Sequence, residues 1–426
     1  MGAQRVGQQF GLGLPREIWL VQIGIFLNAF GWGAVLPFEV IYLHDGRGFA
    51  LGTAGLVVGT LTGVAVLSAP CAGPLIDRFG PRAVAVAAGA ALAAGYVGLA
   101  FARTEPVAFT SAAIAGVGNG ALLPAQSALL AALAAREIRH RAAAVSRVST
   151  NAGFGFGGAL GGLVAGSGLD GFVALLLLNA ATYLAYVGVL VTVVREAAVP
   201  EPLGGGYRDV LSDRPFLRLV VTNTVIIAIG WGVISWVVPP FAKNELGVGS
   251  ELIGLLLLAN AATVVVAQVP IAKLAEGRRR AVMMAIGAGL IAAACLLILA
   301  AGSLGAAGYA AVVVATVTVA VGECFHTAVL MPLVADLAPD HLRGRYMATM
   351  GLSWWAGLAL APTVGTQLLS TSAAVTFLGS AVAAGAAGVS MLALERRLPD
   401  GSRRTPRPEP PLRMKAVLAA SEARGG

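Results

Sequence analysis

Long apolar stretches separated by short polar breaks follow one another along the whole chain. Each holds the roughly 20 residues that an α-helix needs to cross a bilayer. None shows the ten-residue apolar–polar alternation of membrane barrel strands. Because a backbone in lipid must satisfy its own hydrogen bonds, the pattern predicts an all-α membrane protein. The twelve predicted spans lie near 18–43, 52–72, 83–101, 107–133, 147–167, 171–194, 217–241, 251–272, 282–301, 308–334, 347–369 and 373–393.

The polar breaks divide the chain into two groups of six spans. The longest internal break, 195–216, is rich in Pro and Gly and is typical of a cytoplasmic linker. We therefore expect an N-terminal six-helix bundle at 1–194 and a C-terminal one at 217–397, followed by a disordered basic tail at 398–426. The composition agrees, because only 12% of residues are charged, against about 25% in soluble domains.

Lys and Arg fall almost entirely on one side of this topology. With the N-terminus inside, 26 of the 29 basic residues face the cytoplasm, and the outer loops hold Arg47, Arg103 and Lys243. Basic residues favour the cytoplasmic side, so we expect a multi-pass protein of the inner (plasma) membrane with both termini cytoplasmic. Attraction to the membrane surface accounts for the net charge of +8, and no nucleic-acid partner is predicted.

The two groups of spans resemble one another. Shifted by 199 residues, Gly31–Gly33 falls on Gly230–Gly232, and Asp77 falls on Glu276. Because six spans are an even number, the copies run in the same direction through the bilayer. The sequence thus predicts two pseudo-symmetric six-helix bundles related by an axis along the membrane normal.

The loop after the second span carries a recognisable signature, made of Gly73, Asp77, Arg78, Gly80 and Arg82. It resembles the cytoplasmic signature of the major facilitator superfamily, and the resemblance covers the whole membrane region. A carboxylate here can meet an Arg and the positive end of a neighbouring helix, which makes a latch that a change of state must break. Further latch candidates lie in the second half, at Glu276, Arg343 and Arg345.

The fifth span carries a run of glycines, Gly153, Gly157, Gly158, Gly161 and Gly162. The run is similar to the antiporter motif of that superfamily, although Gly158 stands where the motif has proline. Spaced glycines offer a smooth face against which another helix packs or pivots. The resemblance implies the twelve-span drug–proton antiporter branch; an ordinary glycine-lined helix contact is the alternative.

Three ionisable residues are candidates for proton coupling. Glu323 lies near the bilayer midplane, where a carboxylate usually faces a cavity or a partner, and by repeat position its mate is Asn119. His326 is one turn away and is its expected partner in a relay. Glu39 follows Pro37, where it either recruits cationic substrates or is a wet interfacial carboxylate.

Polar and aromatic side chains at depth are candidates for the substrate cavity, which the resemblance builds from spans one, four, seven and ten. Each has a structural alternative, since polar side chains also join helices and Trp often marks an interface. The candidates are Asn28, Trp32, Asn119, Gln126, Asn223, Trp231 and Asn260.

These features favour a monomeric secondary transporter that exports a small hydrophobic or cationic compound in exchange for protons. Proton-coupled uptake on the same fold and a non-transporting membrane protein stay open as alternatives. The stretch Phe109–Gly120 lacks the Arg that many proton-driven exporters carry in span four. No enzyme activity, cofactor or metal site is predicted, and no lysine lies in a nucleotide-binding loop.

Overall fold

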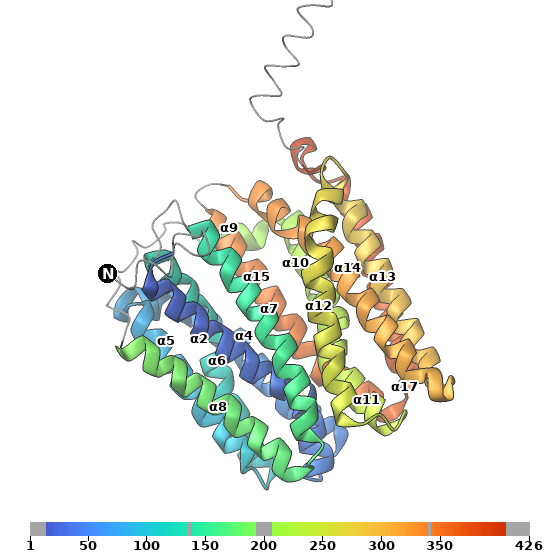
Figure 1. The fold of residues 1–426 in the computed structure, drawn as a ribbon. Coiled ribbons are helices and arrows are strands. Elements are labelled where there is room, and N and C mark those ends of the chain that lie inside the picture. The colour runs from blue at the N-terminus through green and yellow to red at the C-terminus, as the bar shows by residue number, and fades with distance from the viewer. Residues whose placement is uncertain (1–13, 134–138, 193–206, 340–341, 406–426) are drawn as a thin grey trace, which may run out of the picture.

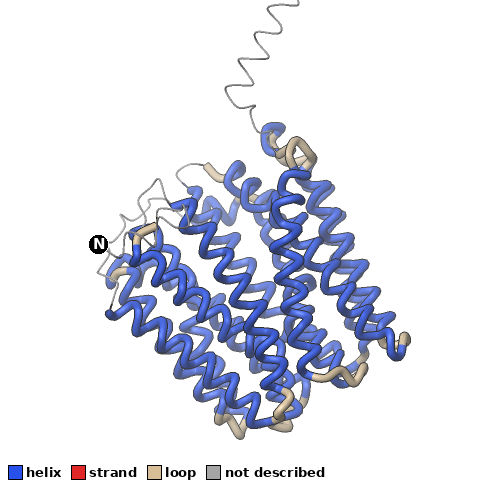
Figure 2. The backbone as a smooth tube through the Cα atoms, viewed as in Figure 1, coloured by secondary structure: helices blue, strands red, loops and turns tan. Residues whose placement is uncertain are grey.

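The computed structural model describes residues 14–133, 139–192, 207–339 and 342–405. Within these ranges a few side chains, including those of Asp77 and Arg343, are also not described. The described chain is built from long helices joined by short loops at their ends (Figures 1 and 2).

The first half holds six helical rods. The first rod is α2 (Arg16–Val35) continued by η1 (Leu36–Phe38), α3 (Glu39–Ile41) and η2 (Tyr42–Gly46). The other five are single helices, namely α4 (Leu51–Phe79), α5 (Pro81–Ala100), α6 (Glu105–Leu133), α7 (Arg139–Ala165) and α8 (Leu169–Thr192).

The second half repeats this order after the short helix α9 (Tyr207–Ser212). Its first rod is α10 (Arg214–Ile227), η3 (Ala228–Val237) and α11 (Val238–Asn244). There follow α12 (Ser250–Ala275), α13 (Arg280–Ala301), η4 (Gly305–Ala307), α14 (Gly308–Leu337), α15 (Arg343–Leu360) with η6 (Ala361–Gly365) and α16 (Thr366–Thr371), and α17 (Ala373–Glu395). The predicted all-α fold of two six-helix bundles is confirmed.

Ten of the rods are long and apolar enough to cross a membrane. The other two are α7 and the α15–α16 rod, which is interrupted by η6. Both are rich in Gly, Ser and Thr, and both contact the other half. Small residues of this kind let helices approach closely, which suits packing between helices.

The first rod of each half is interrupted at matching places. Pro37 lies in η1, the first irregular turn of the first rod, and Pro239 and Pro240 follow the π-helical η3 in the seventh. Proline removes a backbone donor and clashes with the preceding turn, so the helix cannot continue regularly. Irregular turns of this kind re-aim side chains and are frequent at functional sites.

The two halves meet through α7 with α12 and through α4 with the η6–α16 segment. The glycine run of α7 divides between two faces. A Cβ at Gly162 would lie 2.7 Å from the Ser250 carbonyl oxygen of α12, and Gly158 faces the same helix. The remaining three pack against α2 within the first half: Gly153, Gly157 and Gly161.

We call the end where α4 meets α5 at Gly80 the arginine-rich end, and the end with residues 47–50 the opposite end. The described end of the chain, residues 398–405, lies at the arginine-rich end (Figure 1). The sequence predicted disorder from Leu398 onward. Residues 398–405 instead pack on the α12–α13 loop, where the Gly277 N–H donates to the Thr405 carbonyl and the Arg280 N–H donates to the Arg403 carbonyl. A β-bridge between Arg279 and Arg404 adds to this packing.

Candidate functional site

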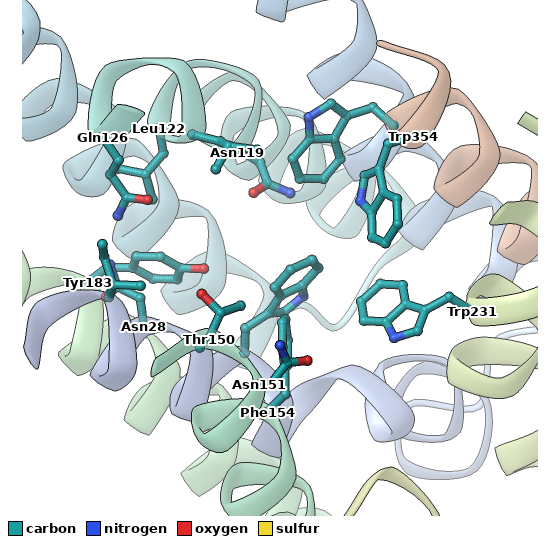
Figure 3. A pocket seen from close by; sticks show the side chains of 15 residues that line it. Asn28, Asn119, Leu122, Gln126, Thr150, Asn151, Phe154, Tyr183, Trp231 and Trp354 are labelled. Carbon is teal, nitrogen blue, oxygen red and sulfur yellow. The ribbon is translucent and has the colours of Figure 1, made fainter. Parts of the chain in front are cut away.

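A cavity of about 330 Å³ lies between the two halves. The first half contributes residues from α2, α6, α7 and α8, and the second half contributes residues from η3 and α15. Its fifteen lining residues are Ile25, Asn28, Ala29, Trp32, Asn119, Leu122, Leu123, Gln126, Thr150, Asn151, Phe154, Tyr183, Trp231, Trp354 and Trp355 (Figure 3).

Most of the polar and aromatic side chains selected from the sequence line this cavity: Asn28, Trp32, Asn119, Gln126 and Trp231. Two do not. Asn223 and Asn260 are buried but are absent from the lining. The sequence analysis missed six polar or aromatic lining residues because spans five, six and eleven were not considered as walls: Thr150, Asn151, Phe154, Tyr183, Trp354 and Trp355.

Aromatic rings from both halves close one side of the cavity. The Trp32 ring centroid lies 4.9 Å from Phe154 and 5.9 Å from Trp231. Trp231 in turn lies 5.7 Å from Trp354 and 5.9 Å from Trp236, with the latter pair edge to face. Such pairs stabilise beyond the area they bury, so the rings form one continuous wall across the junction of the halves.

Glu39 lies behind this wall, bound to both halves. Tyr96 of α5 donates to Glu39 Oε1 at 3.1 Å, and the indole Nε1 of Trp236 donates to Oε2 at 3.0 Å. The Tyr96 ring also lies nearly parallel to that of Tyr183, which lines the cavity. Glu39 is only 5% exposed, so the expectation of a wet interfacial carboxylate is wrong. The partners that bury it come from distant helices.

A second contact joins the same two rods at the opposite end. Lys243 Nζ lies 2.9 Å from Asp45 Oδ2, and 5.5 Å from the centre of the Phe172 ring. Asp45 and Phe172 belong to the first half, and Lys243 belongs to the second. The ion pair and the Glu39–Trp236 hydrogen bond therefore hold the halves together on this side of the cavity.

Glu323 has a different environment, within the second half. Its Oε1 is buried without a hydrogen-bond partner among the described residues. It lies against Gly230 of η3, where an added Cβ would be 3.2 Å from that oxygen. The repeat mates Asn119 and Glu323 were both expected to face the central cavity; Asn119 does, but Glu323 is not among the lining residues.

His326 belongs to a buried hydrogen-bonded group. Its Nε2 lies 2.8 Å from Asn223 Oδ1, and Asn223 Nδ2 donates to Ser353 Oγ at 2.6 Å. The three side chains join α14, α10 and α15. His326 and Glu323 thus have separate surroundings in this structure, although they are one turn apart on the same helix.

The latch residues are spread over the arginine-rich end. Gly80 has a φ of 81°, which suits the tight passage from α4 to α5. Arg82 donates to the Leu190 and Val191 carbonyls at the end of α8, at 2.8 and 2.7 Å. In the second half Arg279 pairs with Glu395.

For the other latch candidates the structure shows mainly how exposed they are. Gly73, Arg78 and Glu276 are exposed, and Arg345 is half-buried with an interaction of its own. The side chains of Asp77 and Arg343 lie outside the described part of the structure.

Two six-helix bundles that enclose a cavity between them define a polytopic membrane transporter. The chain belongs to the Major Facilitator Superfamily, whose sequence profile matches residues 21–223 and again residues 220–424. The two matches correspond to the two halves of the structure.

Individual relatives are distant. The chain is 32% identical over 173 residues to an uncharacterized transporter of this type, YttB of Bacillus subtilis, covering 41% of this chain and 43% of that one. It is 27% identical over 234 residues to the multidrug resistance protein MdtH of Aeromonas hydrophila, covering 54% and 57%. The chain thus matches about half the length of these relatives. Identity to YqjV of Bacillus subtilis is 24%, over 82% of this chain and 85% of that one.

Solved structures share the fold. A peptide transporter POT in complex with sulfate superposes with a TM-score of 0.76 at 17% identity, covering 90% of this chain and 95% of that one. A D-xylose–proton symporter gives a TM-score of 0.73 at 18% identity, covering 91% and 99%. At such identities the likeness shows the fold alone.

Proposed function

We propose that this chain exports a small hydrophobic or cationic compound in exchange for protons, by alternating access. The observation that carries the proposal is a cavity shared by both halves, with contacts between the halves on one side of it. Glu39–Trp236 and Asp45–Lys243 each join the first half to the second. Opening that side requires both contacts to break.

Three features favour export and this orientation. The relative MdtH is named a multidrug resistance protein, and the α7 glycine run is similar to that of antiporters. The concentration of Arg at one end favours a cytoplasmic location for that end and for both termini, in the inner (plasma) membrane. In this orientation the Glu39–Trp236 and Asp45–Lys243 contacts close the cavity toward the outside of the cell. We further propose a monomer, with Asp77 in the latch of the other state; Asp77 was expected in a loop but lies in the last turns of α4.

Proton coupling is assigned to Glu323, with His326 and Glu39 as the further ionisable groups. A buried carboxyl oxygen without a partner is costly in lipid and is typical of a group that binds and releases a proton. It lies beside the irregular segment η3, which changes shape more readily than a regular helix. Substrate binding against Trp231 of the same segment can then affect the surroundings of Glu323.

A vesicle assay tests the proposal. Inverted vesicles that hold the protein receive a panel of hydrophobic and cationic compounds, and proton release is compared with that of vesicles without it. An exporter releases protons on addition of a substrate and raises tolerance to that compound when overproduced. Increased cellular accumulation with proton uptake would instead identify a symporter. An externally accessible tag in the linker after residue 195 would contradict the orientation.

A further inference from the structure

The two halves contribute different chemistry to the cavity lining: both supply aromatic rings, but only the first half supplies amide and hydroxyl groups. Every amide and hydroxyl group of the lining belongs to the first half, at Asn28, Asn119, Gln126, Thr150, Asn151 and Tyr183. The second half contributes only three tryptophans, Trp231, Trp354 and Trp355. Figure 3 shows this division, with Asn28, Gln126 and Tyr183 on one side and Trp231 and Trp354 on the other.

No charged side chain is among the fifteen lining residues. The two carboxylates assigned to helices near the cavity are not part of its lining: Glu39 accepts hydrogen bonds from Tyr96 and Trp236, and Glu323 lies against Gly230. Tryptophan faces attract cations, but this attraction is smaller than the cost of taking a charge out of water without a counter-charge. The lining therefore favours an uncharged molecule over a cation.

The aromatic side favours a flat molecule of limited size. The rings of Trp32 and Trp355 are stacked with centroids 6.5 Å apart, and those of Trp231 and Trp354 are 5.7 Å apart. Rings at such spacing present extended apolar surface to another ring. The volume of about 330 Å³ lies at the lower end of the roughly 300–1,000 Å³ that is typical of small-molecule sites.

We infer that the substrate is an uncharged, flat aromatic molecule with hydrogen-bonding groups at one end. Its rings pack against Trp231, Trp354 and Trp355 of the second half, and its polar end binds the amides of the first half, Asn119 among them. A molecule of this kind contacts both halves at once through different chemistry. This inference rests on the proposed transport function and narrows its substrate class.

A matched pair of probes tests the inference on the unmodified protein. Acridone is a neutral three-ring molecule with a carbonyl and an N–H group; 10-methylacridinium has nearly the same shape but is a cation without either group, so the pair tests the charge and the polar end together. Equilibrium dialysis against the full chain in detergent should give acridone a dissociation constant at least about tenfold lower. Equal binding of the two probes, or tighter binding of the cation, overturns the inference.

A pair of variants locates the polar end. Asn119→Leu should weaken acridone binding about fivefold or more, because the leucine cannot hydrogen-bond the ligand. Asn260→Leu is the matched control: Asn260 is also buried in a helix but lies outside the lining, so acridone binding should not change. If the two variants behave alike, the assignment of the polar end fails.

The binding measurement involves neither protons nor direction, so it separates this inference from the proposed function. Export of cations without preference for acridone refutes the inference and leaves the export function standing. Preferential binding of acridone without proton-linked transport of any compound refutes the function and leaves the cavity chemistry standing.

Discussion

Glu39 is a buried residue and Glu323 a half-buried one, each in a membrane-spanning rod, and their surroundings differ in two respects. Both oxygens of Glu39 accept hydrogen bonds, and the donors come from opposite halves. Glu323 has a buried oxygen without a partner among the described residues and lies within one half. The difference teaches that a carboxylate in an apolar span can hold two bundles together or have an oxygen without a partner, according to its neighbours.

The largest effect is expected from fixing the Glu39 side of the molecule. Cysteines at Asp45 and Lys243, joined by a cleavable thiol cross-linker, should stop transport, because these residues lie on opposite halves that must separate. Transport is measured in vesicles before and after cleavage of the linker, which should restore it.

A matched pair within one half controls for the cross-linking itself. Arg218 Nε donates to Ser390 Oγ at 2.9 Å, and both residues belong to the second half. Cysteines joined at these two positions should leave transport intact. If both cross-links stop transport equally, the Glu39 side is not a moving junction between the halves.

Replacement of Glu323 should cause the next largest effect. Glu323→Gln keeps the size of the side chain but cannot exchange a proton, so proton release on substrate addition should fall to the level of vesicles without the protein. Thermal unfolding should change little, since Oε1 has no partner to lose. Proton exchange as fast as in the parent would show that Glu323 is not the coupling residue.

Glu39→Gln should instead act on stability. The amide has one acceptor oxygen for the two donors, Tyr96 and Trp236, and its own N–H groups face one of them. The loss of one hydrogen bond between buried groups should lower the free energy of unfolding by about 3 kcal/mol. Thermal unfolding in detergent measures the loss, and Glu245→Gln in an exposed loop is the control. A variant as stable as the control would mean that the two hydrogen bonds do not hold the halves.

The smallest effect is expected from removing one donor. Tyr96→Phe deletes the hydroxyl that binds Glu39 Oε1 but keeps the ring that stacks on Tyr183. It should lower the free energy of unfolding by about 1 kcal/mol, the usual net contribution of one hydrogen bond. A loss as large as that of Glu39→Gln would indicate that ring packing, and not the hydrogen bond, was disturbed.

Part of the candidate site could be predicted from the sequence because depth and residue type are visible there. A polar or tryptophan residue in mid-span must pack against protein or line a cavity, and Asn28, Trp32 and Asn119 do line one. The sequence could not separate them from Asn223, which instead bonds His326 and Ser353. Trp354 and Trp355 were visible as an adjacent pair in span eleven, but nothing local showed which way they face.

The sequence by itself determined the membrane class, the two six-helix halves and their parallel relation, because hydropathy, loop length and repeat register are properties of contiguous segments. Only the tertiary structure decided which carboxylate is satisfied and which residues share a cavity. Glu39 meets Tyr96 and Trp236 across 57 and 197 residues of chain. Such contacts depend on how the rods cross and how they are interrupted, which no local pattern specifies.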